Sequence, residues 1–371
     1  MKKIITILGA RPQFVKAAVL SRVISDKNEI EEIIIHTGQH FDTNMSEVFF
    51  EEMEIPKPKY NLNINGLSHG AMTGQMLEKI EKVLLDEKPD AVVIYGDTNS
   101  TIAGALAAKK LDIKVIHIEA GLRSFNMKMP EEINRILTDR ISDLLLCPTD
   151  TAMKNLQREG FDNLDIKIVK SGDIMKDAVE YYGRNSAVKS SIIKDLNLKN
   201  KDFVLSTIHR QENTDDLEKL KSIFEGLEEI AREGQVVLPL HPRTRKILKN
   251  HHLKYDLTFI DPVGYFDMLE LLKNCNLVIT DSGGLQEECS VLGTPCLTLR
   301  WNTERPITLR VNGGVSVLVG NNIERIRKEY HEALKLDRSP KRPELWDGKT
   351  ADLPVPVRTQ TGRVVKISRE R

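Results

Sequence analysis

Residues 277–288 read Leu-Val-Ile-Thr-Asp-Ser-Gly-Gly-Leu-Gln-Glu-Glu, an apolar run followed at once by a glycine turn. The run 277–280 is typical of a buried strand, and Ser282, Gly283 and Gly284 lead into an expected helix. Glycines at such a turn let the backbone approach a phosphate, and a helix N-terminus offers unpaired N–H groups. The carboxylate of Glu288, about one turn later, could reach a ribose. A glycine turn that only packs a helix on a strand is the simpler alternative. The combination with the acidic pair favours a nucleotide diphosphate site.

Short β-branched runs alternate with helix-length segments along most of the chain. In the first half the expected strands are 4–8, 32–36, 91–95, 115–118, 144–147 and 166–170. In the second half they are 203–207, 236–240, 257–260, 277–280, 296–299 and 315–319. Helical patterns lie between them, as at 102–111 and 217–233. This alternation predicts parallel sheets built from βαβ units.

The length of 371 residues favours two domains over one. Two sets of six expected strands, separated by a break near 171–173, predict an α/β fold of two Rossmann-like domains facing a central cleft. We expect these domains at 1–172 and 173–345, followed by a crossing segment or atypical tail at 346–371. The cleft between two such domains is the usual ligand site.

The composition excludes several classes of partner. Lys+Arg and Asp+Glu balance at 54 each, so no global charge would hold nucleic acid or an anionic membrane. The four cysteines form no Cys-x-x-Cys pair, which favours buried free thiols over a zinc site or disulfides. No apolar run approaches the ~18 residues that a membrane span needs. We therefore expect a cytoplasmic protein without a metal site.

Polar residues follow nearly every expected strand, at the edge where parallel sheets place active groups. From the first half these are Arg11, Lys16, Gln39, His40, Asp97, Glu119, Glu131 and Arg135, and from the second half His209, His241 and Arg305. Taken alone, each residue could have a purely structural role instead: Asp97 could cap a helix, and Glu131 could pair with Arg135. A single histidine is most often a satisfied strand-end residue. Their convergence nevertheless predicts a site that binds a diphosphate and moves protons.

The motifs together resemble the non-hydrolysing UDP-N-acetylglucosamine 2-epimerases. The resemblance runs over roughly residues 1–350 and rests on G-A-R-P-x-x-x-K, G-Q-H, G-D-T, E-A-G-L-R, P-E-E-x-N-R, H-R-x-E-N, D-S-G-G-x-Q-E-E, T-E-R-P and W-D-G-K. It implies a GT-B-like fold, a homodimer, and conversion of UDP-GlcNAc to UDP-ManNAc without a cofactor. The implied chemistry is anti-elimination of UDP through a 2-acetamidoglucal intermediate, followed by re-addition.

The resemblance also implies roles for individual residues. Asp97, Glu119 and Glu131 match its acid/base carboxylates, and His209 matches a group near the departing phosphate. Which carboxylate removes the proton and which returns it stays open. The implied substrate contacts are Arg11, Lys16, Arg135, His241, Ser282, Gly283, Gly284, Glu288 and Arg305.

Two segments depart from the family pattern. Gln39 and His40 match a site where many bacterial members bind a second UDP-GlcNAc as activator, but 67–70 reads Leu-Ser-His-Gly without the expected arginine. Activator dependence therefore stays open. In the tail, Pro354 and Pro356 predict that 351–371 does not form the single crossing helix of the family.

Four other functions remain as alternatives. A sister epimerase acting on a UDP-sugar modified at C3 or C6, such as a diacetamido uronic acid, is the nearest, because Trp301-Asn302 replaces an expected acidic residue. A hydrolysing epimerase would release free ManNAc. A GT-B glycosyltransferase would use the same glycine turn but needs an acceptor groove. A nucleotide-sugar sensor without catalytic activity would not need the catalytic motif residues, and in this sequence every such position is filled.

Overall fold

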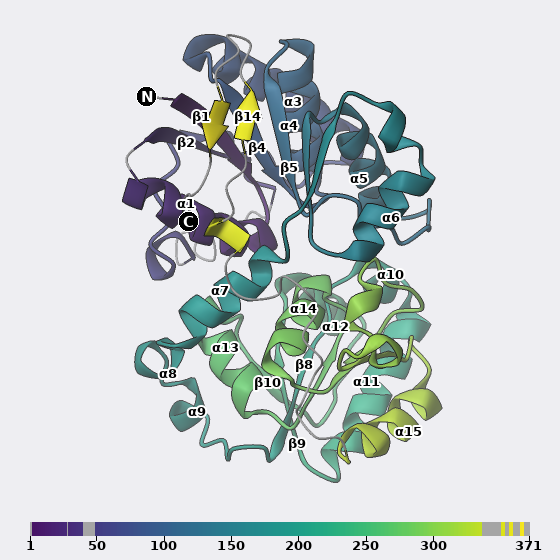
Figure 1. The fold of residues 1–371 in the computed structure, drawn as a ribbon. Coiled ribbons are helices and arrows are strands. Elements are labelled where there is room, and N and C mark those ends of the chain that lie inside the picture. Colours follow the sequence, from purple (N-terminus) through teal and green to yellow (C-terminus); the bar gives the residue numbers. More distant parts are fainter. Residues whose placement is uncertain are drawn as a thin grey trace. The chain divides into compact units, whose positions relative to one another are not determined.

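The computed structural model describes residues 2–27, 29–39, 49–335, 350–352, 356–358 and 364–366. The expected site residue His40, together with Trp346 and Pro354, lies outside the described residues. The chain forms two compact units, and Figure 1 labels many of their helices and strands. Unit 1 comprises Met1–Ala178 and Pro343–Arg371, and unit 2 comprises Val179–Arg342.

The division between the units lies inside helix α7 (Ile174–Gly183), whereas the sequence places a boundary just before that helix. Asp177 in the first half of α7 accepts a hydrogen bond from the backbone N–H of Ala351 at 2.8 Å, and both residues belong to unit 1. Tyr182 at the other end packs against Tyr265 of unit 2, with ring centroids 5.9 Å apart. One helix therefore serves both units, which a boundary drawn from strand spacing misses.

Unit 1 is built on a seven-stranded parallel sheet in the order β3-β2-β1-β4-β5-β6-β7. Its strands are β1 (Lys2–Leu8), β2 (Ile30–His36), β3 (Tyr60–Asn61), β4 (Ala91–Tyr95), β5 (Lys114–Ile118), β6 (Leu144–Cys147) and β7 (Lys167–Lys170). The six strands expected from the sequence are all present. The sequence missed β3, because two residues are too short for a periodic pattern.

The helices of unit 1 are α1 (Arg11–Lys27), α3 (His69–Glu87), α4 (Asn99–Lys110), α5 (Pro130–Ile141) and α6 (Asp150–Arg158), with 3₁₀ turns η1 (Phe161–Asn163) and η4 (Thr350–Asp352). Helix α4 lies close to the centre of the sheet because its inner side is made of small residues. Ala103, Ala105 and Ala108 are fully buried, and a Cβ at Gly104 would lie 2.6 Å from Cδ1 of Ile7. Such close packing fixes the end of β4, where α4 begins.

Unit 2 repeats this topology with a six-stranded parallel sheet in the order β10-β9-β8-β11-β12-β13. Its strands are β8 (Phe203–Thr207), β9 (Gln235–Pro239), β10 (Thr258–Ile260), β11 (Leu277–Thr280), β12 (Cys296–Thr298) and β13 (Ser316–Leu318). All six were expected. Counted from its first strand the order is 3-2-1-4-5-6, as in the first six strands of unit 1, and this is the Rossmann order.

The remaining helices of unit 2 are α8 (Ser186–Lys189), α9 (Ile192–Asp195), α10 (Gln211–Thr214), α11 (Leu217–Ala231), α12 (Pro242–Asn250), α13 (Tyr265–Asn274), α14 (Gly283–Leu292) and α15 (Ile323–Ala333), with 3₁₀ turns η2 (Pro306–Thr308) and η3 (Arg310–Asn312). Leu220, Ile223 and Leu227 of α11 join Ile326 of α15 in one buried cluster. Their spacing of three and four residues is that of an apolar helix face.

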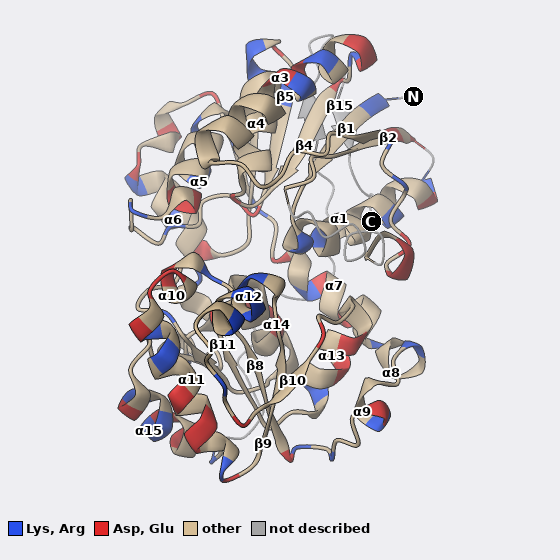
Figure 2. Ribbon diagram, turned by 180° about the vertical axis from the view of Figure 1, so that it is seen from behind, with Lys and Arg blue, Asp and Glu red and all other residues tan. Residues whose placement is uncertain are grey.

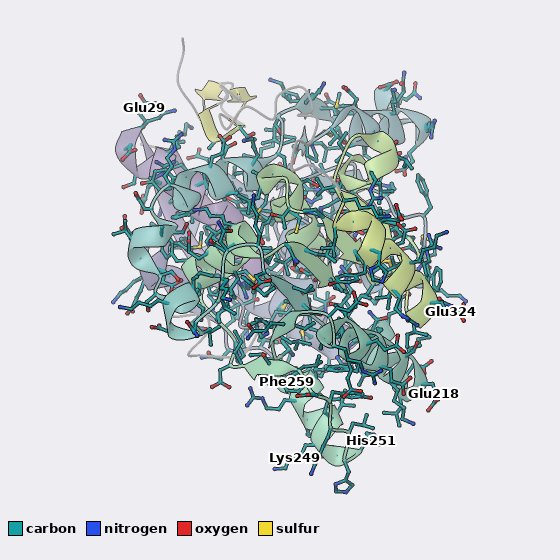
Figure 3. All side chains as sticks on the ribbon, turned by 90° about the horizontal axis from the view of Figure 1, so that it is seen from below. Glu29, Glu218, Lys249, His251, Phe259 and Glu324 are labelled. Atoms are coloured by element: carbon teal, nitrogen blue, oxygen red, sulfur yellow. The ribbon has the colours of Figure 1, made fainter. Side chains whose placement is uncertain are left out.

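Many charged residues lie on the outside of both units, and others are buried in ion pairs. Glu218 and Glu324, in the first turns of α11 and α15, project from the periphery in Figure 3. Figure 2 shows basic and acidic segments on the helices of both units, as the balanced composition predicts. The four cysteines are free and buried, which confirms that expectation.

The tail contains two short strands, β14 (Pro356–Arg358) and β15 (Val364–Lys366), which pair antiparallel with each other. A single helix over 351–371 is therefore absent, as the prolines predict. Among the described helices, none is both long enough and apolar enough to cross a membrane.

Candidate active site

In unit 1, Gln13 joins the turns that follow β1 and β4. Its side-chain oxygen accepts hydrogen bonds from the backbone N–H groups of Gly9 and Ala10 at 2.8 and 3.1 Å. Its side-chain nitrogen donates to the carbonyl oxygen of Tyr95 at 2.8 Å. A Cβ at Gly9 would lie only 2.1 Å from Oγ of Ser100, so the turn tolerates no side chain there. Sequence reasoning missed Gln13, which fixes two strand ends that carry candidate residues.

Glu119 is a buried carboxylate that forms an ion pair with the equally buried Lys16. It directly follows β5 and adopts a left-handed backbone conformation with φ of 71°. Non-glycine residues rarely adopt this conformation, which persists where surrounding contacts enforce it. The backbone N–H groups of Glu119 and Ala120 both donate to the carbonyl oxygen of Leu146, at 3.1 and 3.0 Å. The carboxylate is thus held in place by both its backbone and its lysine partner.

Glu119 approaches Gly96, the residue that directly precedes Asp97 in the turn after β4. A Cβ at Gly96 would lie 3.2 Å from Oε2 of Glu119. The guanidinium of Arg135 binds Asp97, with Nε 3.1 Å from Oδ2, and leaves the Asp97 side chain 25% exposed. Thr98 rather than Asp97 caps α4, since its side chain accepts from the N–H of Thr101. The capping explanation for Asp97 is therefore wrong.

Arg135 is buried and also pairs with Glu132. Glu132 in turn accepts from the backbone N–H groups of Ser124 and Phe125, at 2.9 and 2.8 Å. Arg135 therefore orients Asp97 in this structure. Glu131 lies half-buried in the first turn of α5 and makes no hydrogen bond or ion pair with a described residue. The alternative that Glu131 serves as the partner of Arg135 is thus not what the structure shows.

Two further expected residues lie near the ends of β1 and β2. Arg11 begins α1, and its guanidinium carbon lies 4.7 Å from the ring centroid of Phe49. The side-chain oxygen of Gln39 accepts from the backbone N–H and the hydroxyl of Ser100, at 3.1 and 2.8 Å. Gln39 therefore fastens the chain after β2 to the start of α4.

In unit 2, Asp281 joins the ends of β8 and β11, where the strand order reverses. It is fully buried and accepts from the backbone N–H of Arg210 at 2.9 Å and from the side chain of Asn213 at 3.2 Å. Its Oδ1 lies 3.1 Å from Nδ1 of His209. Burial alone would raise the pKa of Asp281, but the charge and hydrogen bond of His209 and the N–H donors lower it to about 2.

Asp281 orients His209 so that Nδ1 faces the carboxylate and Nε2 is the remaining ring nitrogen for other groups. The imidazole is 40% exposed, and its centroid lies 5.9 Å from that of His241. His241 caps α12, because its Nδ1 accepts from the backbone N–H of Arg243 at 3.2 Å. A histidine held by a buried carboxylate is suited to proton transfer or to stabilising a negative charge.

The turn that the sequence predicts as a phosphate site lies between β11 and α14, as the expected strand and helix require. Ser282 is the N-cap, and its hydroxyl accepts from the N–H of Leu285 at 3.4 Å. A Cβ at Gly283 would lie 3.2 Å from Nη1 of Arg305 and 3.7 Å from Nη2 of Arg210. Two guanidinium groups thus approach the turn, and within the described residues the Arg210 side chain forms no ion pair. Sequence reasoning missed Arg210, although its place in the H-R-x-E-N motif was a usable signal.

Arg305 belongs to a buried cluster of two arginines and two glutamates. It pairs with Glu287 and Glu304, and Glu304 also pairs with Arg300 at 2.6 Å. Glu288, the expected ribose ligand, is 6% exposed on the same helix as Glu287. The four paired charges of the cluster balance, as buried ions require. Within the described residues, no group of three or more His, Cys, Asp or Glu side chains could hold a metal ion.

Comparisons with known proteins agree with this geometry. Two parallel Rossmann-type sheets place the chain in the GT-B-like α/β class, and a solved UDP-GlcNAc 2-epimerase of Methanocaldococcus jannaschii, in complex with UDP-GlcNAc and UDP, superposes with a TM-score of 0.87. That structure is 45% identical and covers 94% of this chain and 97% of its own. Residues 22–354 match the family model described as UDP-N-acetylglucosamine 2-epimerase.

Two curated relatives extend the comparison. A UDP-N-acetylglucosamine 2-epimerase of M. jannaschii is 46% identical over 96% of this chain and 99% of the relative. A UDP-2,3-diacetamido-2,3-dideoxy-D-glucuronate 2-epimerase of Pseudomonas aeruginosa is 54% identical over 86% of this chain and 88% of the relative. The chain therefore belongs to the UDP-N-acetylglucosamine 2-epimerase family.

Proposed function

We propose that this chain is a non-hydrolysing epimerase that inverts C2 of UDP-GlcNAc to give UDP-ManNAc. The observation that carries the proposal is that the Glu119 carboxylate approaches Gly96, the residue before Asp97, and that each carboxylate has its own cation partner, in a member of an epimerase family. Inversion at carbon needs one group to remove a proton and another to deliver one. Two adjacent carboxylates with different partners supply such a pair.

The reaction we propose is elimination followed by re-addition. One carboxylate of unit 1 removes the C2 proton while the bond from C1 to the β-phosphate oxygen breaks and its electrons leave with UDP. A C1–C2 double bond remains. Return of a proton to the opposite face of C2 and re-formation of the C1–O bond complete the inversion. Asp97, Glu119 and Glu131 are the candidate acids and bases, and Lys16 and Arg135 hold the first two in place.

Unit 2 is proposed to bind and stabilise the departing UDP. The N–H groups at the start of α14, with the guanidinium of Arg210 beside Gly283, suit a phosphate. His209, held by Asp281, is placed to stabilise the negative charge that develops on the leaving oxygen. Ser282 and Glu288 are the further proposed nucleotide ligands.

A second candidate substrate is UDP-2,3-diacetamido-2,3-dideoxyglucuronate. The relative from P. aeruginosa that carries this activity in its name is 54% identical to this chain. The acid/base groups and the phosphate turn would act in the same way, and only contacts to the C3 and C6 substituents would differ.

Incubation of the protein with each UDP-sugar in deuterated water tests the proposal. Deuterium at C2 of a UDP-ManNAc product is the expected result, and preferential turnover of the diacetamido uronate would favour the second candidate. Release of free ManNAc would instead identify a hydrolysing enzyme. An unchanged C2 centre in both sugars would overturn the proposal.

We also propose that the protein acts as a homodimer in the cytoplasm. The family resemblance supports the dimer, and four buried free thiols fit a reducing compartment. Sedimentation analysis checks the assembly, and a monomer that is fully active would contradict it.

A further inference from the structure

Four titratable side chains form a chain of hydrogen bonds that begins on β5 and is buried except at its last member. His117, on β5, lies with Nδ1 2.7 Å from Oδ1 of Asp139, on α5. The other Asp139 oxygen accepts from Nη1 of Arg123 at 2.7 Å. Arg123 then binds Glu159 through two hydrogen bonds, each of 2.7 Å. The side chains of His117, Asp139 and Arg123 are fully buried, whereas that of Glu159 is 32% exposed.

The partners of His117 determine its charge. Its Nε2 lies 2.7 Å from the carbonyl oxygen of Gly96, which can only accept a hydrogen bond. Its Nδ1 faces the carboxylate of Asp139, which also accepts from Arg123 and from the backbone N–H of Gly121 at 3.1 Å. Both ring nitrogens must therefore carry a proton if both hydrogen bonds are made. A neutral imidazole would leave a buried lone pair facing an acceptor.

Asp139 also accepts from Arg123 and from the N–H of Gly121, and these donors favour its ionised form independently of His117. Burial by itself would raise the pKa of Asp139, but the hydrogen bond and charge of His117, together with Arg123, hold the pKa below its ordinary value. With His117 protonated, this row of four side chains contains two cations, His117 and Arg123, and two carboxylates, so its net charge is zero.

The pair of His117 and Asp139 stabilises the two turns that carry proposed acid/base groups. His117 binds the carbonyl of Gly96, the residue before Asp97, and Gly96 also donates its N–H to the carbonyl of Ile118 at 3.0 Å. Asp139 binds the N–H of Gly121, two residues after Glu119. One side-chain pair thus holds the backbone of the two turns that carry Asp97 and Glu119.

We propose that His117, protonated on both ring nitrogens and locked by Asp139, is a positioning element that sets the relative placement of Asp97 and Glu119. The inference rests on the proposed epimerase function. His117 and Asp139 touch no reacting atom in this scheme and act through the two turns. A displacement of about 1 Å in a catalytic group can cost roughly 10²-fold in rate, so loss of the pair is expected to lower kcat more than KM.

The first test compares Asp139→Asn with a matched variant, Asp143→Asn. Asp143 holds the opposite end of β5 through a hydrogen bond of 2.9 Å from the N–H of Val115, and it pairs with Lys109 and Lys114. We expect Asp139→Asn to lower kcat by about 10²-fold, with KM and the UDP affinity within a few-fold of wild type. Asp143→Asn should keep kcat within about two-fold. Equal kcat values for both folded variants would overturn the inference.

The second test measures the wild-type protein and uses one variant only to assign its signals. The protein has nine histidines, so selective ¹⁵N-histidine labelling gives a small set of ring signals, and His117→Gln assigns the pair that disappears. We expect both ring nitrogens of His117 to be protonated at neutral pH. One unprotonated nitrogen would overturn the inference even if Asp139→Asn does not fold. Should wild type epimerise neither UDP-sugar, the proposed function fails, while the ¹⁵N spectrum still decides the charge of His117.

Discussion

At the point where the strand order reverses, the two sheets are joined in different ways. In unit 1 the neutral amide of Gln13 connects the ends of β1 and β4, and in unit 2 the carboxylate of Asp281 connects those of β8 and β11. The amide satisfies its backbone partners without charge. The carboxylate also fixes the orientation of His209. One topology therefore supports either a passive junction or one that prepares an ionisable group.

The ion pairs near these junctions also differ between the two units. In unit 1, Glu119 and Asp97 are held by the cations Lys16 and Arg135. In unit 2 the carboxylates hold cations instead, since Glu287 and Glu304 fix Arg305 beside the phosphate turn. The comparison teaches that equivalent sheet edges can present carboxylates held by cations in one unit and cations held by carboxylates in the other. Variants should then separate chemistry from nucleotide binding.

The largest effect is expected for the carboxylates of unit 1. Asp97→Asn, Glu119→Gln and Glu131→Gln should each lower kcat by about 10²–10⁴-fold, because each removes a group that could exchange a proton with C2. The UDP affinity should be retained. Steady-state epimerisation and calorimetric titration with UDP measure the two effects. Glu78→Gln is the control, since Glu78 is exposed on α3 and pairs only with a neighbouring lysine among the contacts described. Near-normal turnover in all three variants would break the comparison.

The next largest effect is expected at the phosphate turn of unit 2. Arg210→Ala and Ser282→Ala should weaken UDP binding by roughly 1.5–3 kcal/mol, because each removes a polar partner of a charged ligand. Arg210 is a sharper target than Arg305, whose removal would also leave Glu287 and Glu304 unbalanced.

Controls for this prediction exist in the same unit. Asn322→Ala removes the N-cap of α15, as Ser282→Ala does for α14, and Arg327→Ala removes an exposed arginine. Both controls should bind UDP as wild type does. If the test and control variants lose the same affinity in calorimetry, the turn is not a nucleotide site.

A smaller effect concerns the stability of the two junctions in acid. The pKa of Asp281 is about 2 in the folded protein, below its ordinary value of 3.8. Asp281 therefore contributes stability that is present above pH ~4 and is lost as the pH falls through ~2. The lowered pKa corresponds to about 2 kcal/mol of the free energy of unfolding.

Denaturant titrations at pH 7 and pH 3 test this difference. The destabilisation caused by Asp281→Asn should shrink by roughly half at pH 3. That of Gln13→Ala should stay constant, since an amide does not titrate. A pH-independent effect of Asp281→Asn would contradict the ionised junction.

The smallest effect is expected for the end of the chain. Among the described strands, β14 and β15 pair only with each other, and an isolated hairpin contributes little stability. Truncation after Asp352 should keep kcat within a few-fold and the unfolding midpoint within several degrees. Truncation after Thr350 should destabilise more, because Ala351 is buried and bonds Asp177. Kinetics and thermal unfolding of both truncations give the comparison.

Much of this architecture is encoded locally and could be predicted. Each of the twelve expected strands is a short β-branched run between helical segments, and each is present. The short strands β3, β14 and β15 were not predicted, because two or three residues show no periodic pattern and their pairing depends on neighbours in space. The polar strand ends were also predictable, since parallel topology places them at one edge.

The partners of those strand-end residues could not be predicted. Gln13 bonds a residue 82 positions away, and Asp281 bonds the N–H of a residue 72 positions away. No local pattern reports such contacts. Arg135 was expected to bind substrate, but the structure surrounds it with Asp97 and Glu132. His117 lies inside a strand pattern that accounts for it as an ordinary core residue, so its two acceptors become visible only in the fold.

The hydrogen bond between Asp177 and Ala351 has a consequence for synthesis on the ribosome. It joins residues 174 positions apart, and all of unit 2 lies between them. A chain made at about 5–20 residues per second needs roughly 10–35 s to extend from one to the other. During that interval the seven strands of unit 1 have all been synthesised, yet α7 still lacks this contact. A translational pause within unit 2 would lengthen the time for which nascent unit 1 must rely on its sheet alone.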